Sequence, residues 1–301
     1  MAKVILLFVD GVGIGRGEAE SNPCVKARTT IFRLFDTPHG IRSHAPLPYG
    51  GIPRGLDASL GVSGLPQSGT GQTTILTGYN AAQLEGRHVP AFPTRRLQAL
   101  LAEHSLLKQV VRRGKRGLFL NAYRPTSSLQ EERRRRRWVS ASTVANRAAR
   151  LPFHTLEDIR AGRALYHDFT NCALRERGFP LPCYSPVTAG GILARRVQDT
   201  DFLFFEYFQT DLAGHAQDVE RGVSELEKLE AFILQILRLV DLTTTVCLLV
   251  SDHGNLEDMR VRTHTRNKAL AVIWGQENGV LAGRLHSLTD VAPVVLQALE
   301  L

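Results

Sequence analysis

The stretch TTTVCLLVSDHGN at 243–255 decides the fold, because an apolar run of strand length leads directly into Ser, Asp and His. Two other stretches have the same form, VILLFVDG at 4–11 and FLFFEYFQTD at 202–211. Short runs that are apolar throughout are typical of parallel strands buried on both faces. Because helical patterns separate these runs, the sequence predicts an α/β fold with a mostly parallel sheet sandwiched by helices.

The same patterns extend outward to the other elements. Apolar residues recur at helical spacing over 94–113, and GKRGLFLNAY then indicates a turn into a strand. The further expected elements are a helix from just after Ser68 to Gly78, helices at 187–197, 219–240 and 289–300, and strands at 3–9, 202–208, 243–250 and 269–274. Between 36 and 67 the chain is rich in Gly, Pro and His, and we expect no regular element there.

The segment 124–186 differs from the rest, with arginine-rich and mixed polar stretches and several prolines. We interpret it as a small cap inserted into the sheet domain. The predicted organisation is a core formed by 1–123 and 187–301, interrupted by the cap at 124–186.

The composition is typical of a soluble globular chain, with 301 residues that are 43% hydrophobic and 22% charged. No apolar run approaches the ~20 residues of a membrane helix, and the N-terminus lacks the pattern of a cleaved signal peptide. Four cysteines stand far apart without a CxxC pair, which indicates neither a disulfide framework nor a thiolate zinc site. We expect a cytoplasmic protein with no membrane partner.

The formal charge of +8 comes from arginine rather than lysine, and one run is concentrated at Arg133–Arg137. Like-charge blocks are usually solvated, and this is the favoured interpretation. Nucleic-acid binding is the less favoured one. A third interpretation is that part of the arginine excess faces an anionic substrate, since guanidinium suits phosphate.

Three acids stand at or just past the carboxyl ends of the three buried strands: Asp10, Asp211 and Asp252. Ligands of open α/β sheets bind at that edge. An acid that caps a strand end or a turn is the alternative for each one alone, but three together predict a common site.

Histidines accompany these acids. Asp211 and His215 are four residues apart, which places both on one face of a helical turn. His253 directly follows Asp252, and His264 precedes the strand expected at 269–274. A mixture of carboxylates and imidazoles suits Zn²⁺ or Mn²⁺ better than Ca²⁺. The sequence therefore predicts a site for two divalent metal ions, the number that clamps an in-line displacement.

A nucleophile for such a site is expected in LPQSGTGQTT at 65–74. Ser68 is placed at the start of a helix, where backbone N–H groups and the helix dipole favour a phosphate. The alternatives are an ordinary N-cap serine, and Thr70 as the nucleophile in the same loop.

These residues resemble the motifs of the alkaline phosphatase superfamily, and in particular its branch of cofactor-independent phosphoglycerate mutases and phosphopentomutases. The motifs occur in the family's order: FVDGVGIG at 8–15, QSGTGQTTILTG at 67–78, TDLAGH at 210–215, SDHGN at 251–255, HTRN at 264–267 and LTDVAPVVLQAL at 288–299. The resemblance implies one metal held by Asp211, His215 and His264. It implies a second held by Asp10, Asp252, His253 and the oxygen of Ser68, and its spacing favours Ser68 over Thr70.

Departures from the family pattern bear on the substrate. The mutases carry a larger cap than 124–186, and Gln72 stands where they commonly have histidine. The Cys/Ser-x-Pro-x-Arg setting of sulfatases is lacking. We therefore expect a hydrolase that acts on a small phosphorylated substrate through a phosphoserine at Ser68, with a phosphosugar or phosphoglycerate mutase as the alternative. Two other classes stay open, a metal-binding protein without turnover and a basic nucleic-acid-binding protein.

Overall fold

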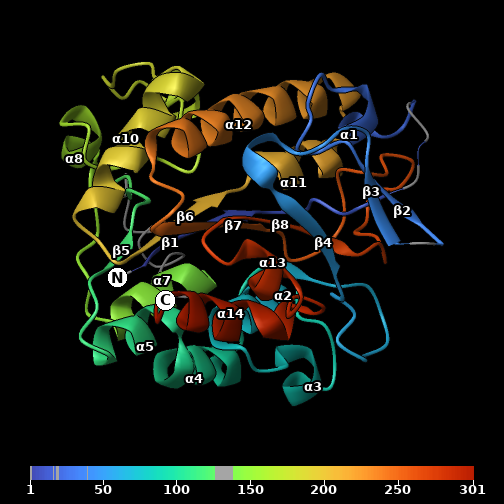
Figure 1. Cartoon of the computed structure of the whole chain (residues 1–301), viewed down its shortest axis with the longest axis horizontal. Coiled ribbons are helices and arrows are strands. Elements are labelled where there is room, and N and C mark those ends of the chain that lie inside the picture. Colours follow the sequence, from blue (N-terminus) through green and yellow to red (C-terminus); the bar gives the residue numbers. More distant parts are fainter. Residues whose placement is uncertain (1, 16, 18–19, 39, 126–137) are drawn as a thin grey trace.

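The computed structural model describes residues 2–15, 17, 20–38, 40–125 and 138–301. Its centre is a six-stranded sheet with helices on both faces, in the order β4-β8-β7-β1-β6-β5 (Figure 1). The strands are β1 (Lys3–Val9), β4 (Ile52–Leu56), β5 (Gly117–Phe119), β6 (Phe202–Tyr207), β7 (Thr245–Val250) and β8 (Ala269–Gly275). A separate antiparallel pair is formed by β2 (Leu34–Thr37) and β3 (Gly40–Ser43).

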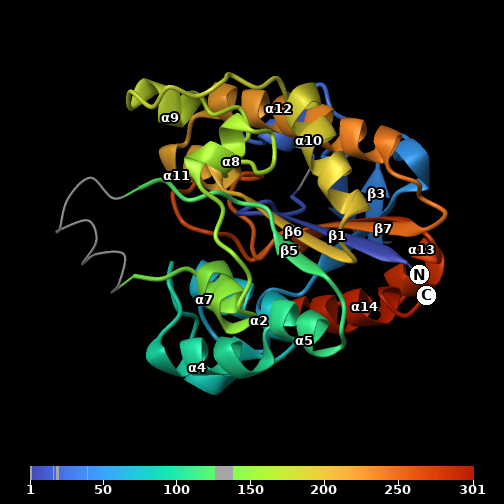
Figure 2. The ribbon, with the colours of Figure 1, turned by 90° about the vertical axis from the view of Figure 1, so that its left-hand side faces the viewer.

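The helices fall into two layers that cover the faces of the sheet (Figures 1 and 2). Their bounds are α1 (Pro23–Lys26), α2 (Ser68–Thr77), α3 (Ala81–Glu85), α4 (Arg95–His104), α5 (Leu106–Arg112), α7 (Ala141–Ala148), α8 (Leu156–Arg160), α9 (Cys172–Glu176), α10 (Pro186–Gln198), α11 (Gln209–Ala216), α12 (Val219–Leu239), α13 (Asn278–Ala282) and α14 (Val291–Ala298), with 3-10 turns η1 (Pro48–Gly50) and η2 (Leu288–Asp290). Among these described helices, none combines the length and the apolar composition needed to cross a membrane.

The mostly parallel α/β sheet expected from the sequence is confirmed. Strand β1 pairs in parallel with β6 on one side and with β7 on the other, and β5 pairs in parallel with β6. Strand β8 is antiparallel to both β7 and β4. The three apolar runs are thus the neighbouring strands β7, β1 and β6, and their carboxyl ends meet at one edge.

Two regions differ from expectation. We expect no regular element over 36–67, but this range contains β3, the turn η1 and β4, the last of which lies at the edge of the main sheet. Strand β4 has no apolar run because an edge strand is only half-buried, and Pro53 within it is tolerated there. The helix expected over 94–113 is two helices that meet at Ser105, whose backbone is extended (φ −60°, ψ 142°).

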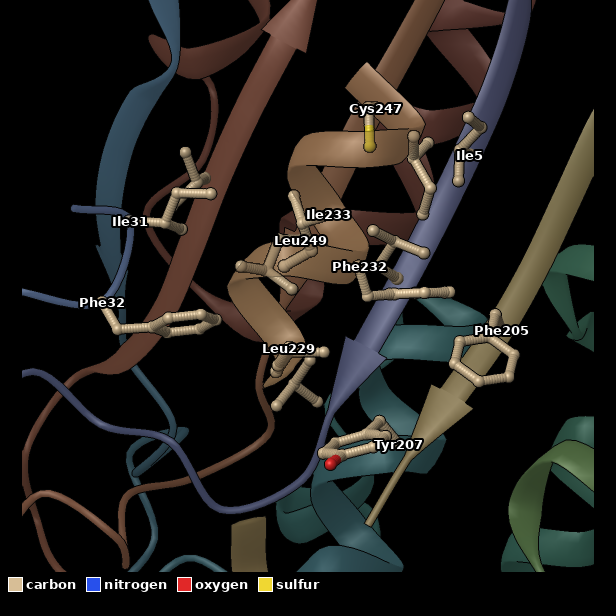
Figure 3. Packing of buried hydrophobic residues seen from close by; sticks show 14 of the residues in the cluster. Ile5, Ile31, Phe32, Phe205, Tyr207, Leu229, Phe232, Ile233, Cys247 and Leu249 are labelled. Carbon is tan, nitrogen blue, oxygen red and sulfur yellow. The ribbon is translucent and has the colours of Figure 1, made fainter. Parts of the chain in front are cut away.

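Both faces of the sheet are sealed by apolar side chains. On one face, Leu229, Phe232 and Ile233 of α12 pack on side chains from β1, β6 and β7 (Figure 3). On the other, α2, α5 and α14 cover a second cluster that includes Phe8. The sheet therefore holds the strand ends at fixed positions, which a site that joins several strands requires.

The segment 124–186 contains α7, α8 and α9 among its described residues. Helix α7 contacts α2, α4 and α5, whereas α8, α9 and their loops share a small core of Ala122, Leu156, Ile159, Ala164, Tyr166, Leu174 and Leu181. Phe169 stacks on Phe232 of α12 at a ring-centroid distance of 4.5 Å and an angle of 7°, which ties this segment to the sheet domain. Its division from the core as a cap stays a proposal, and the run Arg133–Arg137 lies outside the described residues.

Candidate metal centre

The centre begins at the edge where the parallel strands end. Asp10 follows β1, and its N–H donates to the carbonyl of Tyr207 on β6 at 3.0 Å. Asp252 follows β7, on the other side of β1, and is fully buried. The pairing of the strands therefore brings the two carboxyl groups together, as expected from their place in the sequence.

Asp211 and His215 lie on α11, the short helix that follows β6. Their spacing puts Asp211 Oδ2 3.3 Å from His215 Nε2. Gly11 lets this helix approach the end of β1: its φ is +69°, and a Cβ there would lie 2.6 Å from Asp211 Oδ1. A glycine is required at this position for both reasons.

The two other histidines connect these acids. The rings of His253 and His264 stack at a centroid distance of 3.7 Å. His253 Nε2 lies 3.4 Å from Asp10 Oδ1 and 3.4 Å from Asp252 Oδ2. His264 Nε2 lies 3.2 Å from His215 Nε2 and 3.7 Å from Asp211 Oδ1. The six side chains expected to bind metal are thus all brought together.

Within the described residues, these side chains form two overlapping groups of metal-ligand type. The donor atoms of Asp10, Asp252 and His253 all lie within 4.8 Å of one another, and so do those of Asp211, His253 and His264. His253 belongs to both groups. His215 joins the second through its short contacts with Asp211 and His264. The sets differ from those implied by the family resemblance, in which His253 serves one ion only.

Two observations show that this arrangement fits a metal. Asp10 Oδ1 and Asp252 Oδ2 are buried without a hydrogen-bond partner, which is costly unless a cation satisfies them. The Nδ1 atoms of His215 and His264 lie 2.9 Å and 2.8 Å from the carbonyls of Arg262 and Pro66. Donation to those carbonyls fixes the tautomer and leaves each Nε2 as a free lone-pair donor that faces the carboxylates.

The electrostatics of the metal-free chain point the same way. Burial, and next the Asp252 carboxyl, raise the pKa of Asp10 well above its usual value. Burial and the Asp211 carboxyl raise the pKa of Asp252 to about 7. Burial, together with the neighbouring His264, lowers the pKa of His253 to about 3. The site thus gathers buried acids that form no ion pair with a described Lys or Arg side chain, and a bound divalent ion would supply the balancing charge.

Comparisons with known proteins agree with this chemistry. A family model described as Metalloenzyme superfamily matches residues 188–301, a range that includes Asp211, His215, Asp252, His253 and His264. The 2,3-bisphosphoglycerate-independent phosphoglycerate mutase of Wolinella succinogenes is 29% identical over 123 residues, which make up 39% of this chain and 25% of that protein.

Two solved structures share the fold. A protein from Pyrococcus horikoshii has a TM-score of 0.61 at 16% identity, and the alkaline phosphatase from the Antarctic bacterium TAB5 has a TM-score of 0.50 at 12% identity. Each comparison covers 99% of this chain and 97% of the other. These two likenesses show the fold. Together with the family model and the curated mutases, they support the resemblance to metalloenzymes of the alkaline phosphatase superfamily that the motifs carry. The matched part spans only about a quarter of the length of the curated mutase.

The expected nucleophile, Ser68, is the first residue of α2, and Gln67 occupies the N-cap position without a side-chain capping bond. Ser68 Oγ lies 3.0 Å from Nε2 of His253, the side chain that belongs to both metal-ligand groups. The rival Thr70 is fully buried. Its hydroxyl donates to the Gln67 carbonyl at 3.1 Å and accepts from Val89 N–H at 3.3 Å, so it serves the backbone of the loop.

Several supporting residues of the metalloenzyme site were not predicted from the sequence. Asn255 donates to Asp211 Oδ1 at 2.7 Å, and Gln72 Nε2 lies 3.5 Å from Asp10 Oδ2. Glu257 is buried and accepts from the N–H groups of Gly13 and Asn255 and from the side chain of Asn267 at 2.8–2.9 Å. Asn255 and Gln72 stand inside the quoted motifs, whereas nothing in the local pattern marks Glu257 as buried.

We expect Glu257→Gln to loosen the loops that carry Asp252, His253 and His264. The amide directs a donor at backbone N–H groups that now face a carboxylate, and a lost hydrogen bond to a charged group costs about 2–3 kcal/mol. Substitution of residues that support metal ligands typically weakens metal affinity 10- to 100-fold. Urea unfolding and a titration with Zn²⁺ measure the two effects.

The matched control is Glu220→Gln, since that side chain is 77% exposed and forms a surface ion pair with Lys26. Equal metal affinity in wild type and Glu257→Gln would contradict a positioning role for Glu257.

Proposed function

We propose that the chain is a two-metal phosphoester hydrolase that acts through a phosphoserine at Ser68. The observation that carries this proposal is the position of Ser68. It is the first residue of α2, and its Oγ lies 3.0 Å from Nε2 of His253, which belongs to both groups of metal-ligand side chains. A hydroxyl at a helix N-terminus faces backbone N–H groups that favour an anion. Nucleophile, phosphate-binding groups and metal ligands thus converge at one point.

The chain's own residues divide the work. Asp10, Asp252 and His253 would hold one divalent ion, and Asp211, His215 and His264 a second, in a mixed donor set that suits Zn²⁺ or Mn²⁺. When bound, these ions would lower the pKa of the Ser68 hydroxyl and offset charge on the transferring phosphoryl group. Ser68 Oγ attacks phosphorus, the alcohol leaves, and water then cleaves the phosphoserine.

Two glycines in the first turn of α2 allow this approach. A Cβ on Gly71 would lie 2.9 Å from the Cβ of Asp252, and one on Gly69 would lie 2.7 Å from the Val89 carbonyl. Larger residues would push the start of α2 away from the metal ligands. The glycines next to Ser68 therefore support the position of the proposed nucleophile as well as the approach of a phosphate.

Hydrolysis is favoured over isomerisation because water reaches the site. The side chain of His215 is 44% exposed, and a mutase must keep water from its phosphoenzyme while the substrate is reoriented. The second candidate, phosphoglycerate mutase activity, is supported by the curated relatives, which are named for that reaction.

One assay separates these candidates. We expect the chain loaded with Zn²⁺ or Mn²⁺ to release free phosphate from simple phosphoesters faster than it forms positional isomers from 3-phosphoglycerate or ribose 1-phosphate. Phosphate and isomers are measured in the same samples. Rapid isomer formation without phosphate release would overturn the hydrolase proposal and favour the mutase. Bound metal without either product would favour a metal-binding protein without turnover.

A further inference from the structure

A cavity of about 470 Å³ lies beside the metal centre, and none of the proposed metal ligands lines it. It is bounded by the ends of β5 and β6, by α7 and by the segment before α8. Its walls combine aromatic rings with about as many polar or charged side chains, among them Arg124, Arg147 and Glu206. This size and this lining are typical of pockets that enclose an organic ligand.

Three structural relations place residues of the cavity wall near the elements that carry Ser68 and the metal ligands. Glu206, which lines it, pairs in register with Phe8 of β1 and so lies on the same face of the sheet as Asp10 two residues further along. Phe92 also lines the cavity. A Cβ added to Gly69, the residue after Ser68, would lie 3.0 Å from the carbonyl oxygen of Phe92. Two residues of the cavity wall thus lie next to β1 and to the start of α2, the elements that carry Asp10 and Ser68.

A third side reaches the other metal group. Phe208 lines the cavity and directly precedes α11, the helix of Asp211 and His215. The ring of His167 lies 5.4 Å from that of Phe208 at a tilt of 47°, and its Nδ1 lies 3.3 Å from Nε2 of Gln209, the first residue of α11. A group bound at Ser68 would therefore have the cavity beside it.

Three aromatic side chains of the cavity wall are partly exposed to solvent. Phe92, Trp138 and Phe153 are 38%, 49% and 39% exposed, although all three are large apolar side chains. Phe92 and Trp138 form a tilted pair at 5.8 Å, and Phe153 meets Tyr123 edge-on at 5.0 Å and 89°. Exposed aromatic side chains gathered around one cavity indicate a binding surface rather than a folding core.

We infer that this cavity receives the alcohol part of the substrate, and that this part carries a planar aromatic group. The inference rests on the proposed function, because Ser68 fixes where the phosphate lies. A ring that enters the cavity meets the faces and edges of Phe92, Trp138, Phe153 and Phe208, and such contacts favour aromatic over aliphatic groups of similar size. A three-carbon phosphoglycerate offers no ring and would leave most of the volume unfilled. The substrate class is thus an aromatic phosphoester.

The first test measures binding without chemistry. The full chain is titrated calorimetrically with 2-naphthalenemethanol, an aromatic alcohol without phosphate. We expect saturable binding that Phe153→Ala weakens about 3- to 10-fold, the loss of one aromatic pair. Phe153→Leu, which keeps apolar bulk without a ring, should lie between wild type and Phe153→Ala.

The matched control is Tyr79→Ala. Tyr79 is 50% exposed and lies 4.7 Å from the ring of His104, outside the lining of the cavity. Its removal should leave the affinity for the alcohol unchanged. Absence of binding, or an equal loss in Tyr79→Ala and Phe153→Ala, would overturn the inference.

The second test links the cavity to turnover. With metal-loaded chain, benzyl phosphate and ethyl phosphate present similar alkyl alcohol leaving groups that differ in the ring. We expect a higher kcat/KM for benzyl phosphate and a smaller ratio of the two values in Phe153→Ala. A ratio near one in wild type would refute the aromatic preference. If the alcohol binds and no ester turns over, the proposed hydrolysis fails while the assignment of the cavity stands.

Discussion

Ser68→Ala is expected to abolish phosphoester turnover and to leave the fold intact. The hydroxyl contacts His253 in the centre, and Gln67 rather than Ser68 occupies the N-cap position of α2. Removal of a nucleophile that forms a covalent intermediate typically costs ~10⁴-fold or more in kcat. The change in the free energy of unfolding should stay below about 1 kcal/mol, the usual worth of a helix cap. Initial rates and urea unfolding of the same preparations measure both.

Thr70 provides the matched control for this loop. Thr70→Ser keeps the hydroxyl that joins Gln67 and Val89, and we expect it to retain most of the activity. Thr70→Ala should lose stability by about 1–3 kcal/mol, because the buried Val89 N–H loses its acceptor. If folded Thr70→Ala loses turnover and Ser68→Ala retains it, Thr70 is the nucleophile and the assigned role of Ser68 is wrong.

The parts of this fold that could be predicted are those with a strong local pattern. Strands β1, β6 and β7 are buried on both faces, so the sequence of each is an apolar run. Parallel pairing of these strands then brings Asp10 and Asp252 to one edge. The i, i+4 spacing of Asp211 and His215 is likewise a local pattern, and it predicts that both lie on one face of a helical turn. Strand β4 was missed because an edge strand needs only partial burial, and half-buried residues next to Pro53 give no periodic signal.

Features that depend on distant residues could not be predicted. Glu257 is a charged residue in a loop, and it is buried where Gly13, Asn255 and Asn267, from three parts of the chain, donate hydrogen bonds to it. The aromatic cavity likewise joins Phe92, Trp138, Phe153 and Phe208, which stand far apart in the chain. No short segment of the sequence contains enough of these residues to predict that they line one cavity. The assembly of these residues is a property of tertiary packing.

The last prediction concerns Asp252, whose replacement should have opposite effects without and with metal. In the metal-free chain, burial and the Asp211 carboxyl raise the pKa of Asp252 to about 7, above the usual 3.8. A carboxyl whose pKa is raised by folding favours the folded state least when it is ionised. The stability of wild type should therefore fall as pH rises from about 4 to about 7, by an amount of a few kcal/mol at most.

Asn at this position cannot ionise. Without metal, the stability of Asp252→Asn should therefore change less with pH over that window, and above pH 7 the variant should be more stable than wild type. With bound metal, we expect the opposite order of stability, with wild type more stable than Asp252→Asn. Wild type gains about 2.7 kcal/mol per site when the free ion exceeds its Kd 100-fold, and the variant lacks the charged ligand that this binding requires. Thermal unfolding in chelator and in Zn²⁺ or Mn²⁺, across pH, measures both effects.

Elemental analysis completes the test, with about two ions per chain expected in wild type and fewer in Asp252→Asn. Asp199→Asn is the matched control, because that side chain is 74% exposed and contacts Arg196 at the surface; it should behave as wild type in both conditions. Full metal occupancy in Asp252→Asn, or no bound metal in reconstituted wild type, would contradict the assignment of the centre. The expected result is that Asp252→Asn is more stable than wild type without metal and is stabilised less by metal. That result would show that the buried acid destabilises the chain by itself and contributes to stability by binding a cation.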